Sequence, residues 1–164
     1  NFLIFLNFIL IHMRDLIISN SFDYTVYTDG ACLGNPGKGG WAAIIFDFKN
    51  QKTVLCGFDN STTNNRMEII AIIEALKNIN KKSNINLITD SKYVIDGIND
   101  WIKKWVNNNW KTSNNKDVKN KDLWIELNTL NQFHNINWEW VKGHSGDIYN
   151  EEVDKIAREQ AKNL

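Results

Sequence analysis

Residues 22–41 read FDYTVYTDGACLGNPGKGGW, and this stretch frames the interpretation of the rest of the chain. Its first seven residues alternate and are rich in aromatic and β-branched side chains, which predicts a strand over residues 22–28. We expect this strand to stop at Asp29-Gly30 and a glycine-rich loop to follow over residues 31–40. The loop lacks a Gly-Lys-Ser or Gly-Lys-Thr ending, so it does not match a phosphate-binding P-loop.

Strand and helix patterns follow one another downstream of this stretch. Residues 41–48 and 52–58 predict two strands that continue the first one as an antiparallel meander. Ser61 and Thr62 supply cap chemistry for the helix that comes next. The later elements are expected at residues 64–79 (helix), 85–89 (strand), 92–97 and 101–109 (short helices separated by a break at Gly97), 122–133 (helix), 136–141 (strand) and 151–162 (helix). Strands that alternate with helices should lie parallel to the first strand, which gives an α/β fold with a five-stranded mixed sheet flanked by helices.

The composition is that of a single globular domain with segregated charge. The chain has 164 residues, of which 43% are hydrophobic, and its 19 basic and 19 acidic residues cancel. Residues 101–121 nevertheless carry six lysines against one aspartate, so the charge is segregated along the chain. A protein that binds nucleic acid needs a basic face but need not be basic overall. The two cysteines form no CxxC motif and no paired framework, which favours a reducing cytoplasmic compartment and argues against a zinc site.

The first twelve residues, NFLIFLNFILIH, are apolar but fit no targeting signal. The run is about half the ~20 residues needed to span a bilayer, and it lacks a basic start and a small-residue cleavage site. We expect Met13 to be the natural start, residues 1–20 to be a tail outside the fold, and residues 21–164 to be the domain. A membrane anchor or an interaction tail is the alternative for residues 1–12.

Four carboxylates occupy positions where a charge is costly. Asp29 and Asp90 each end an apolar strand pattern, and Glu68 lies on the side of its helix that carries alanine and isoleucine. Asp154 shares a helix side with Asn150 and two alanines by the same spacing. An isolated buried charge costs several kcal/mol, so four such groups suggest a common divalent metal.

Each carboxylate also has an ordinary structural explanation when it is taken alone. Asp29 before a glycine could be a turn residue, and Asp90 with the following serine could cap the next helix. Glu68 could pair with Arg66, and Asp154 could be a solvated charge beside basic neighbours on its helix. For each of the four carboxylates, composition and periodicity are consistent with a metal ligand and with an ordinary structural role.

Four motifs in the chain resemble those of bacterial-type ribonuclease H, the family called ribonuclease HI. They are YTDGACLGNPGKGGW from residue 27, TTNNRMEI from residue 62, ITDSKYVIDGI from residue 88 and WEWVKGHSGDIYNEEVD from residue 138. The segment WIKKWVNNNWKT from residue 101 is similar to the family's basic protrusion. The resemblance covers residues 22–161 in order, and each motif holds one of the four carboxylates.

The resemblance implies a ribonuclease-H-like fold and endonucleolytic hydrolysis of the RNA strand of RNA–DNA hybrids. It implies two Mg²⁺ ions about 4 Å apart, with Mn²⁺ as a substitute, and products with a 5′-phosphate and a 3′-hydroxyl. The metal ligands carried over are Asp29, Glu68, Asp90 and Asp154. His144, which has a glycine on its N-terminal side and another two residues later, is carried over as the helper in proton transfer or product release. Without the resemblance, His144 would be read as an exposed loop residue.

The resemblance also implies which residues contact the hybrid. Those near the RNA strand are Gly30, Ala31, Cys32, Asn35 and Glu68, those near the DNA strand are Thr63, Asn64 and Trp101, and the expected phosphate contacts are Lys103, Lys104 and Lys111. Trp105 and Trp110 are expected to pack inside the protrusion. Residues 106–109 lack the further basic residues of the family, which predicts weaker and more salt-sensitive binding. Lys92 stands beside Asp90 where bacterial members often carry glutamine, and we expect it to alter metal affinity.

Two other functions compete with this one. The first is a different nuclease on the same fold, although exonucleases of that kind usually carry Asp-x-Glu where this chain has Asp29-Gly30-Ala31. The second is a non-catalytic hybrid-binding module, which would have no need for four carboxylates. We expect a cytoplasmic monomer that acts in primer removal during DNA replication and in hybrid clearance, without contact to a membrane.

Overall fold

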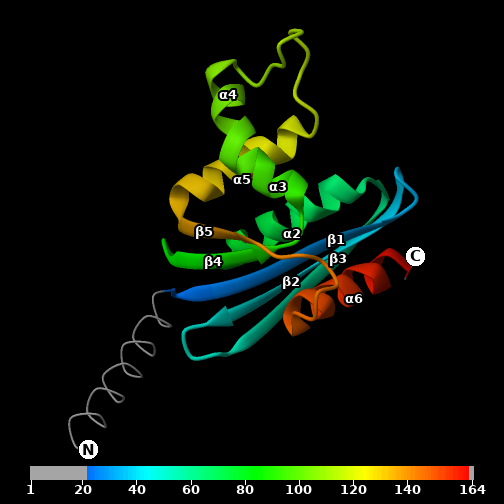
Figure 1. Ribbon diagram of the computed structural model, residues 1–164, viewed down its shortest axis with the longest axis vertical. Coiled ribbons are helices and arrows are strands. Elements are labelled where there is room, and N and C mark those ends of the chain that lie inside the picture. The colour runs from blue at the N-terminus through cyan, green and yellow to red at the C-terminus, as the bar shows by residue number, and fades with distance from the viewer. Residues whose placement is uncertain (1–21, 163–164) are drawn as a thin grey trace, which may run out of the picture.

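The computed structural model describes residues 22–162 (Figure 1). The expectations about the tail at residues 1–20 and about a start at Met13 therefore lie outside the described residues. The elements are β1 (Tyr24–Leu33), β2 (Gly37–Asp47), β3 (Lys52–Thr62), α2 (Asn64–Asn78), β4 (Asn84–Thr89), α3 (Lys92–Asp96), the π-helical turn η1 (Gly97–Trp101), α4 (Ile102–Asn107), α5 (Lys121–Phe133), β5 (Asn135–Trp140) and α6 (Ile148–Lys162).

The strands form one five-stranded sheet in the order β3-β2-β1-β4-β5. β1, β2 and β3 pair antiparallel, and β4 pairs parallel with both β1 and β5. Helices α2, α3 and α5 lie on one face of the sheet, and α6 covers part of the other (Figure 1). The expected α/β class and five-stranded mixed sheet are confirmed.

β1 is longer than the sequence pattern predicts. The expectation that it stops at Asp29-Gly30 is wrong, because the strand continues to Leu33, which pairs with Lys38 of β2. The parallel pairing of β1 with β4 does end next to Asp29, because its last pair is Thr28 and Thr89. Beyond Thr28, β1 no longer pairs with β4, but β2 still pairs with its other edge. The hydrogen bonds to β2 satisfy backbone groups of β1, so the strand continues. The expected ten-residue loop shrinks to residues 34–36.

Thr63 caps α2, and Ser61 and Thr62 do not, because these two residues still belong to β3. The side chain of Thr63 accepts the backbone N–H of Arg66 at 3.4 Å. α6 begins at Ile148, three residues earlier than expected, and Asp147 Oδ1 accepts the N–H of Asn150 at 3.0 Å. The helices therefore start where a side chain satisfies their first free donors.

Gly97 does not break the helical segment, contrary to expectation. The chain passes through η1 directly into α4. A Cβ at Gly97 would overlap the ring of Trp124, which is fully buried. The glycine is therefore a packing requirement, and the π-helical turn carries the chain past the indole.

Two apolar clusters stabilise the sheet. The larger fills the space between the sheet and α2, α3 and α5, and the smaller joins β2 to Val153 and Ala157 of α6. Trp105 packs on Trp110 at a ring-centroid distance of 6.4 Å and on Trp124 of α5 at 5.5 Å. Both protrusion tryptophans therefore have a packing role, but they join the main core and do not form a separate core inside the protrusion. Within residues 22–162, no helix has the length and hydrophobicity that crossing a bilayer requires.

Candidate active site

Three carboxylates converge where the parallel pairing of β1 and β4 ends. Asp29 and Asp90 directly follow the last paired residues of the two strands, and Glu68 approaches from α2. One oxygen of each residue lies within 4.8 Å of the other two. Asp29 and Glu68 are each only 5% exposed. Asp29 is a strand residue that pairs with Ala42, so the turn explanation of Asp29 is wrong. The predicted convergence of carboxylates is found for Asp29 and Asp90 at the strand ends and for Glu68 on α2.

Glu68 is held by one donor on β1 and by a second donor one turn earlier on its own helix, α2. The backbone N–H of Gly30 donates to Oε2 at 3.1 Å, and Asn64 Nδ2 donates to Oε1 at 3.3 Å. A Cβ at Gly30 would overlap the backbone of Glu68, so only glycine lets β1 and α2 approach this closely. Arg66 pairs with Asp122 at 2.8 Å, which removes it as a partner for Glu68.

Asp90 is held by the end of β5, by the segment that follows it and by the start of α6. Asn150 Nδ2 donates to Asp90 Oδ2 at 3.3 Å, and Trp140 Nε1 donates to the Asp90 carbonyl at 3.0 Å. Gly143 packs so closely that a Cβ there would lie 2.6 Å from Asp90 Oδ2. The hydroxyl of Ser91 accepts the N–H of Val94, so the cap of α3 does not use the Asp90 carboxylate.

Asp154 lies beside this group and not within it. It lines the same hollow as the other three carboxylates, which has a volume of about 350 Å³. Its Oδ1 accepts Arg158 Nε at 2.7 Å, and its side chain is 22% exposed. The alternative reading of Asp154 as a charge paired on its own helix is thus correct as geometry, although the residue also faces the site.

Burial and the neighbouring carboxylates raise the pKa of Asp29 and of Glu68. Burial, followed by the charges of Asp90 and Asp154, raises the pKa of Asp29 to about 8. Burial, followed by the charges of Asp29 and Asp90, raises the pKa of Glu68 well above its usual value. Buried oxygens that repel one another fit a hard divalent cation, because the cation would neutralise them. The donor set is therefore suited to Mg²⁺ or Mn²⁺.

His144 stands in the exposed loop between β5 and α6. Its backbone φ is +54°, a left-handed conformation that few residues other than glycine adopt. Its Nε2 lies 3.3 Å from Arg158 Nη2. His144 is thus connected to the carboxylates through Arg158 and is not part of their cluster.

The hybrid-contact residues expected near the carboxylates do lie there. Gly30, Ala31, Cys32 and Asn64 line the same hollow. Asn35 Oδ1 accepts the backbone N–H of Asn64 at 3.3 Å. The loop after β1, which is expected at the RNA strand, and the start of α2, which is expected at the DNA strand, are therefore joined beside the site.

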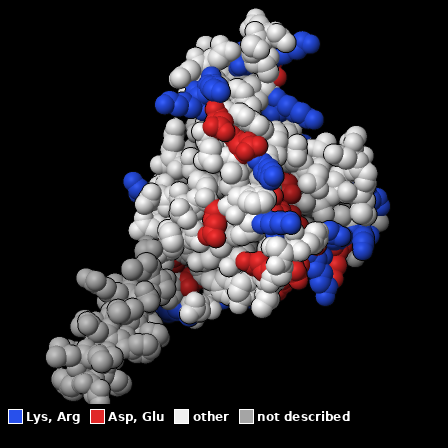
Figure 2. All heavy atoms as spheres, in the orientation of Figure 1, with Lys and Arg blue, Asp and Glu red and all other residues white. Residues whose placement is uncertain are grey.

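Of the other expected contacts, the three lysines lie on the protrusion formed by α4 and the loop that follows it, Trp101 ends η1 just before α4, and Thr63 lies at the start of α2. Lysine side chains stand out on this upper part of the molecule in Figure 2. Lys103 and Lys104 are exposed, and Lys111 is paired with Asp117 at 2.8 Å. Trp101 packs edge-on against Tyr93 with centroids 5.6 Å apart. The structure thus separates a basic surface from the acidic hollow.

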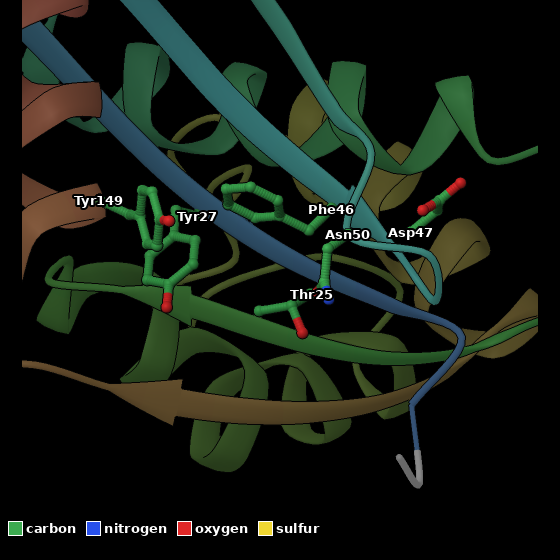
Figure 3. A pocket seen from close by; sticks show the side chains of 6 residues that line it. All are labelled: Thr25, Tyr27, Phe46, Asp47, Asn50 and Tyr149. Atoms are coloured by element: carbon green, nitrogen blue, oxygen red, sulfur yellow. The ribbon is translucent and has the colours of Figure 1, made fainter. Parts of the chain in front are cut away.

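A further hollow of about 340 Å³ lies on the sheet face that α6 partly covers (Figure 3). It is lined by Thr25, Tyr27, Phe46, Asp47, Asn50 and Tyr149. Asp47 Oδ1 already accepts the N–H groups of Lys49 and Gln51 in the β2–β3 turn. The hollow offers one engaged carboxylate and three aromatic rings, which is not the donor set of a metal site.

Three residues of the site were missed by the sequence reasoning. Arg158 contacts Asp154 and His144, Asn150 contacts Asp90, and Gly143 leaves room for the Asp90 carboxylate. For Asn150 and Arg158 the available signal was their four-residue spacing from Asp154, which places them on the same side of a helix. The close packing of Gly143 had no such signal.

Known proteins resemble this chain over nearly all of the described residues. The RNase H family model matches residues 21–162. A ribonuclease H of Ehrlichia chaffeensis is 56% identical over 135 residues, which are 82% of this chain and 92% of that protein. A ribonuclease H of Wolbachia pipientis wMel is 56% identical over 133 residues, which are 81% of this chain and 91% of that protein. The crystal structure of LC9-RNase H1, a type 1 RNase H with the type 2 active-site motif, has a TM-score of 0.76 at 29% identity and covers 85% of this chain and 72% of its own. With the carboxylate cluster and the sheet order, these similarities show that the chain belongs to the RNase H family of nucleases.

Proposed function

We propose that this protein is an endoribonuclease that hydrolyses the RNA strand of RNA–DNA hybrids and leaves 5′-phosphate and 3′-hydroxyl ends. The observation that carries the proposal is the set of three carboxylates within 4.8 Å of one another at the end of the parallel strands. Membership of the RNase H family supports the substrate class.

Asp29, Glu68, Asp90 and Asp154 would hold two Mg²⁺ ions, with Mn²⁺ as a substitute. The ions would supply activation of the attacking water and stabilisation of the leaving oxygen. The protein's own part is to hold the ligands in place. The Gly30 N–H and the Asn64 amide fix both oxygens of Glu68, and the Asn150 amide fixes one oxygen of Asp90.

His144 would carry a proton to or from the product oxygen on Nε2, and its exposed, glycine-flanked loop leaves it room to move. Lys103, Lys104 and Lys111 would contact phosphates of the hybrid, giving sequence-independent affinity that falls with salt. We propose that the protein acts as a cytoplasmic monomer in primer removal and hybrid clearance.

Cleavage of labelled substrates tests the proposal. The protein is incubated with an RNA–DNA hybrid, double-stranded DNA and single-stranded RNA, each with Mg²⁺ or with EDTA. We expect cutting of the RNA in the hybrid alone, and only with Mg²⁺. Asp29→Asn should abolish cutting, whereas Glu159→Gln, an exposed change on α6, should leave it intact. Cutting in EDTA, or equal cutting of DNA, would refute the proposal.

Binding measurements separate the non-catalytic alternative from the enzyme. A module that only recognises hybrids would bind them normally with no cleavage at any Mg²⁺ concentration. An enzyme with the proposed site should cleave, and its Asp29→Asn variant should still bind the hybrid. Binding without cleavage by the unaltered protein would therefore favour the module.

A further inference from the structure

Asp154 differs from the other three carboxylates of the site because a cation already binds it. Arg158 Nε lies 2.7 Å from Asp154 Oδ1, one helical turn further along α6. Within residues 22–162 no comparable ion pair is found at Asp29, Glu68 or Asp90. A divalent ion that binds Oδ1 of Asp154 must therefore compete with a guanidinium for that oxygen.

The same guanidinium also contacts His144. Arg158 Nη2 lies 3.3 Å from His144 Nε2, and Arg158 itself lines the acidic hollow. Because arginine can only donate hydrogen bonds, Nε2 accepts in this contact. One side chain thus holds a carboxylate of the site with one nitrogen and the loop histidine with another.

We propose that Arg158 is an internal counter-cation that a divalent ion displaces from Asp154, and that this displacement releases His144. The inference rests on the proposed function, since it assumes that Asp154 is a metal ligand. Arg158 is a positioning residue in this scheme, because it acts through Asp154 and His144. The two contacts of Arg158, with Asp154 and with His144, couple metal binding at Asp154 to the position of the histidine.

The size of the effect follows from the exposure of the pair. The side chain of Arg158 is 52% exposed, so solvent and salt screen its attraction to Asp154. Removal of a partly exposed competing cation should strengthen Mg²⁺ binding by roughly two- to fivefold. A larger gain in Mg²⁺ affinity would require a buried ion pair, and the pair of Arg158 with Asp154 is partly exposed.

Calorimetric titration with MgCl₂, without nucleic acid, tests the competition. Arg158→Met removes the charge and keeps an apolar stem. We expect this variant to bind Mg²⁺ more tightly than the unaltered protein, by the factor given above for loss of the competing cation. Lys155→Met is the matched control, because it removes the same charge from the same helix at a side chain that is 76% exposed. Among residues 22–162, the ion-pair partner of Lys155 is Glu159, which is also outside the site. The Mg²⁺ affinity of Lys155→Met should change by less than about twofold. Arg158→Lys keeps the charge and should stay close to the unaltered protein.

The coupling to His144 is read from its ring signals in a carbon–proton NMR spectrum. In the unaltered protein these signals should move as Mg²⁺ is added, with the same midpoint as the calorimetric titration. In Arg158→Met the Mg²⁺-dependent movement should fall by at least about half, because the linking contact is gone.

The outcomes distinguish this inference from the proposed function. If the unaltered protein cleaves hybrids with Mg²⁺ but Arg158→Met binds Mg²⁺ no more tightly than Lys155→Met, the competition is refuted and the enzyme assignment stands. An unchanged His144 response in Arg158→Met would refute the coupling. If the unaltered protein neither binds Mg²⁺ nor cleaves, both proposals fail.

Discussion

Gly143→Ala should impair the site while leaving the fold intact. The new Cβ would lie 2.6 Å from Asp90 Oδ2, whereas ordinary contacts begin near 3.4 Å. The two atoms therefore have to separate by about 0.8 Å, and the mobile partner is the carboxylate. That movement changes the position of Oδ2, the oxygen to which Asn150 Nδ2 donates at 3.3 Å. A proposed metal ligand is displaced as a result.

The expected loss is in activity and metal affinity. Changes to residues that orient metal ligands typically cost 10- to 100-fold, and we expect Gly143→Ala to fall in this range for hybrid cleavage at limiting Mg²⁺. The free energy of unfolding should change by less than about 1 kcal/mol, because Gly143 does not have a left-handed backbone and alanine restricts the unfolded chain. Cleavage at several Mg²⁺ concentrations and urea unfolding measure the two effects.

Gly146→Ala is the control from the same loop. Gly146 has a φ of +93° and open space around its Cβ position, so alanine there strains the backbone without approaching Asp90. We expect a cost of about 1–2 kcal/mol in the loop and a Mg²⁺ dependence like that of the unaltered protein. If Gly143→Ala retains full activity at low Mg²⁺, or if both variants lose activity equally, the close packing of Gly143 on Asp90 has no functional consequence.

Three further changes probe the charges and the core. In EDTA, Asp29→Asn should raise the free energy of unfolding by roughly 0.5–2 kcal/mol, since it removes one of the mutually repelling carboxylates, and urea unfolding measures this. Burial lowers the pKa of His134 in the folded protein, so as pH falls the histidine is protonated in the unfolded chain before it is protonated in the folded one. The free energy of unfolding should therefore be level above about pH 6.5 and decrease below it. His134→Gln should flatten that decrease in melting curves recorded from pH 7 to pH 5. Gly97→Ala should cost about 1–3 kcal/mol by crowding Trp124, and an unchanged urea midpoint would show that the indole moves freely aside.

The convergence of three carboxylates was predictable because each one follows from a local pattern. Strand periodicity placed Asp29 and Asp90 at the point where the parallel pairing ends, and helix periodicity placed Glu68 on the buried side of α2. Sheet topology then brings these positions together. Sequence spacing could not say that the pKa of Asp29 rises to about 8, because that depends on the distances between side chains from three elements.

The missed features depend on contacts between distant parts of the chain. β1 continues past Asp29 because β2 still pairs with it, and a strand pattern contains no information about its partner. Gly97 was predicted as a break because an isolated glycine usually disfavours a helix. The demand for glycine comes instead from Trp124 on α5, which the local sequence around residue 97 does not reveal.

α6 shows how packing places a functional row of side chains. Its buried apolar positions are alanine or valine, and a Cβ at Gly40 of β2 would overlap the backbone of Ala157. This close approach fixes the rotation of the helix, so the side carrying Asn150, Asp154 and Arg158 must face the end of β1 and β4. The amide then reaches Asp90, and the guanidinium reaches the loop histidine. A bulkier residue at the glycine position would move the whole row, so Gly40→Ala should reduce Mg²⁺ affinity and thermal stability together, whereas Gly143→Ala should reduce the affinity alone.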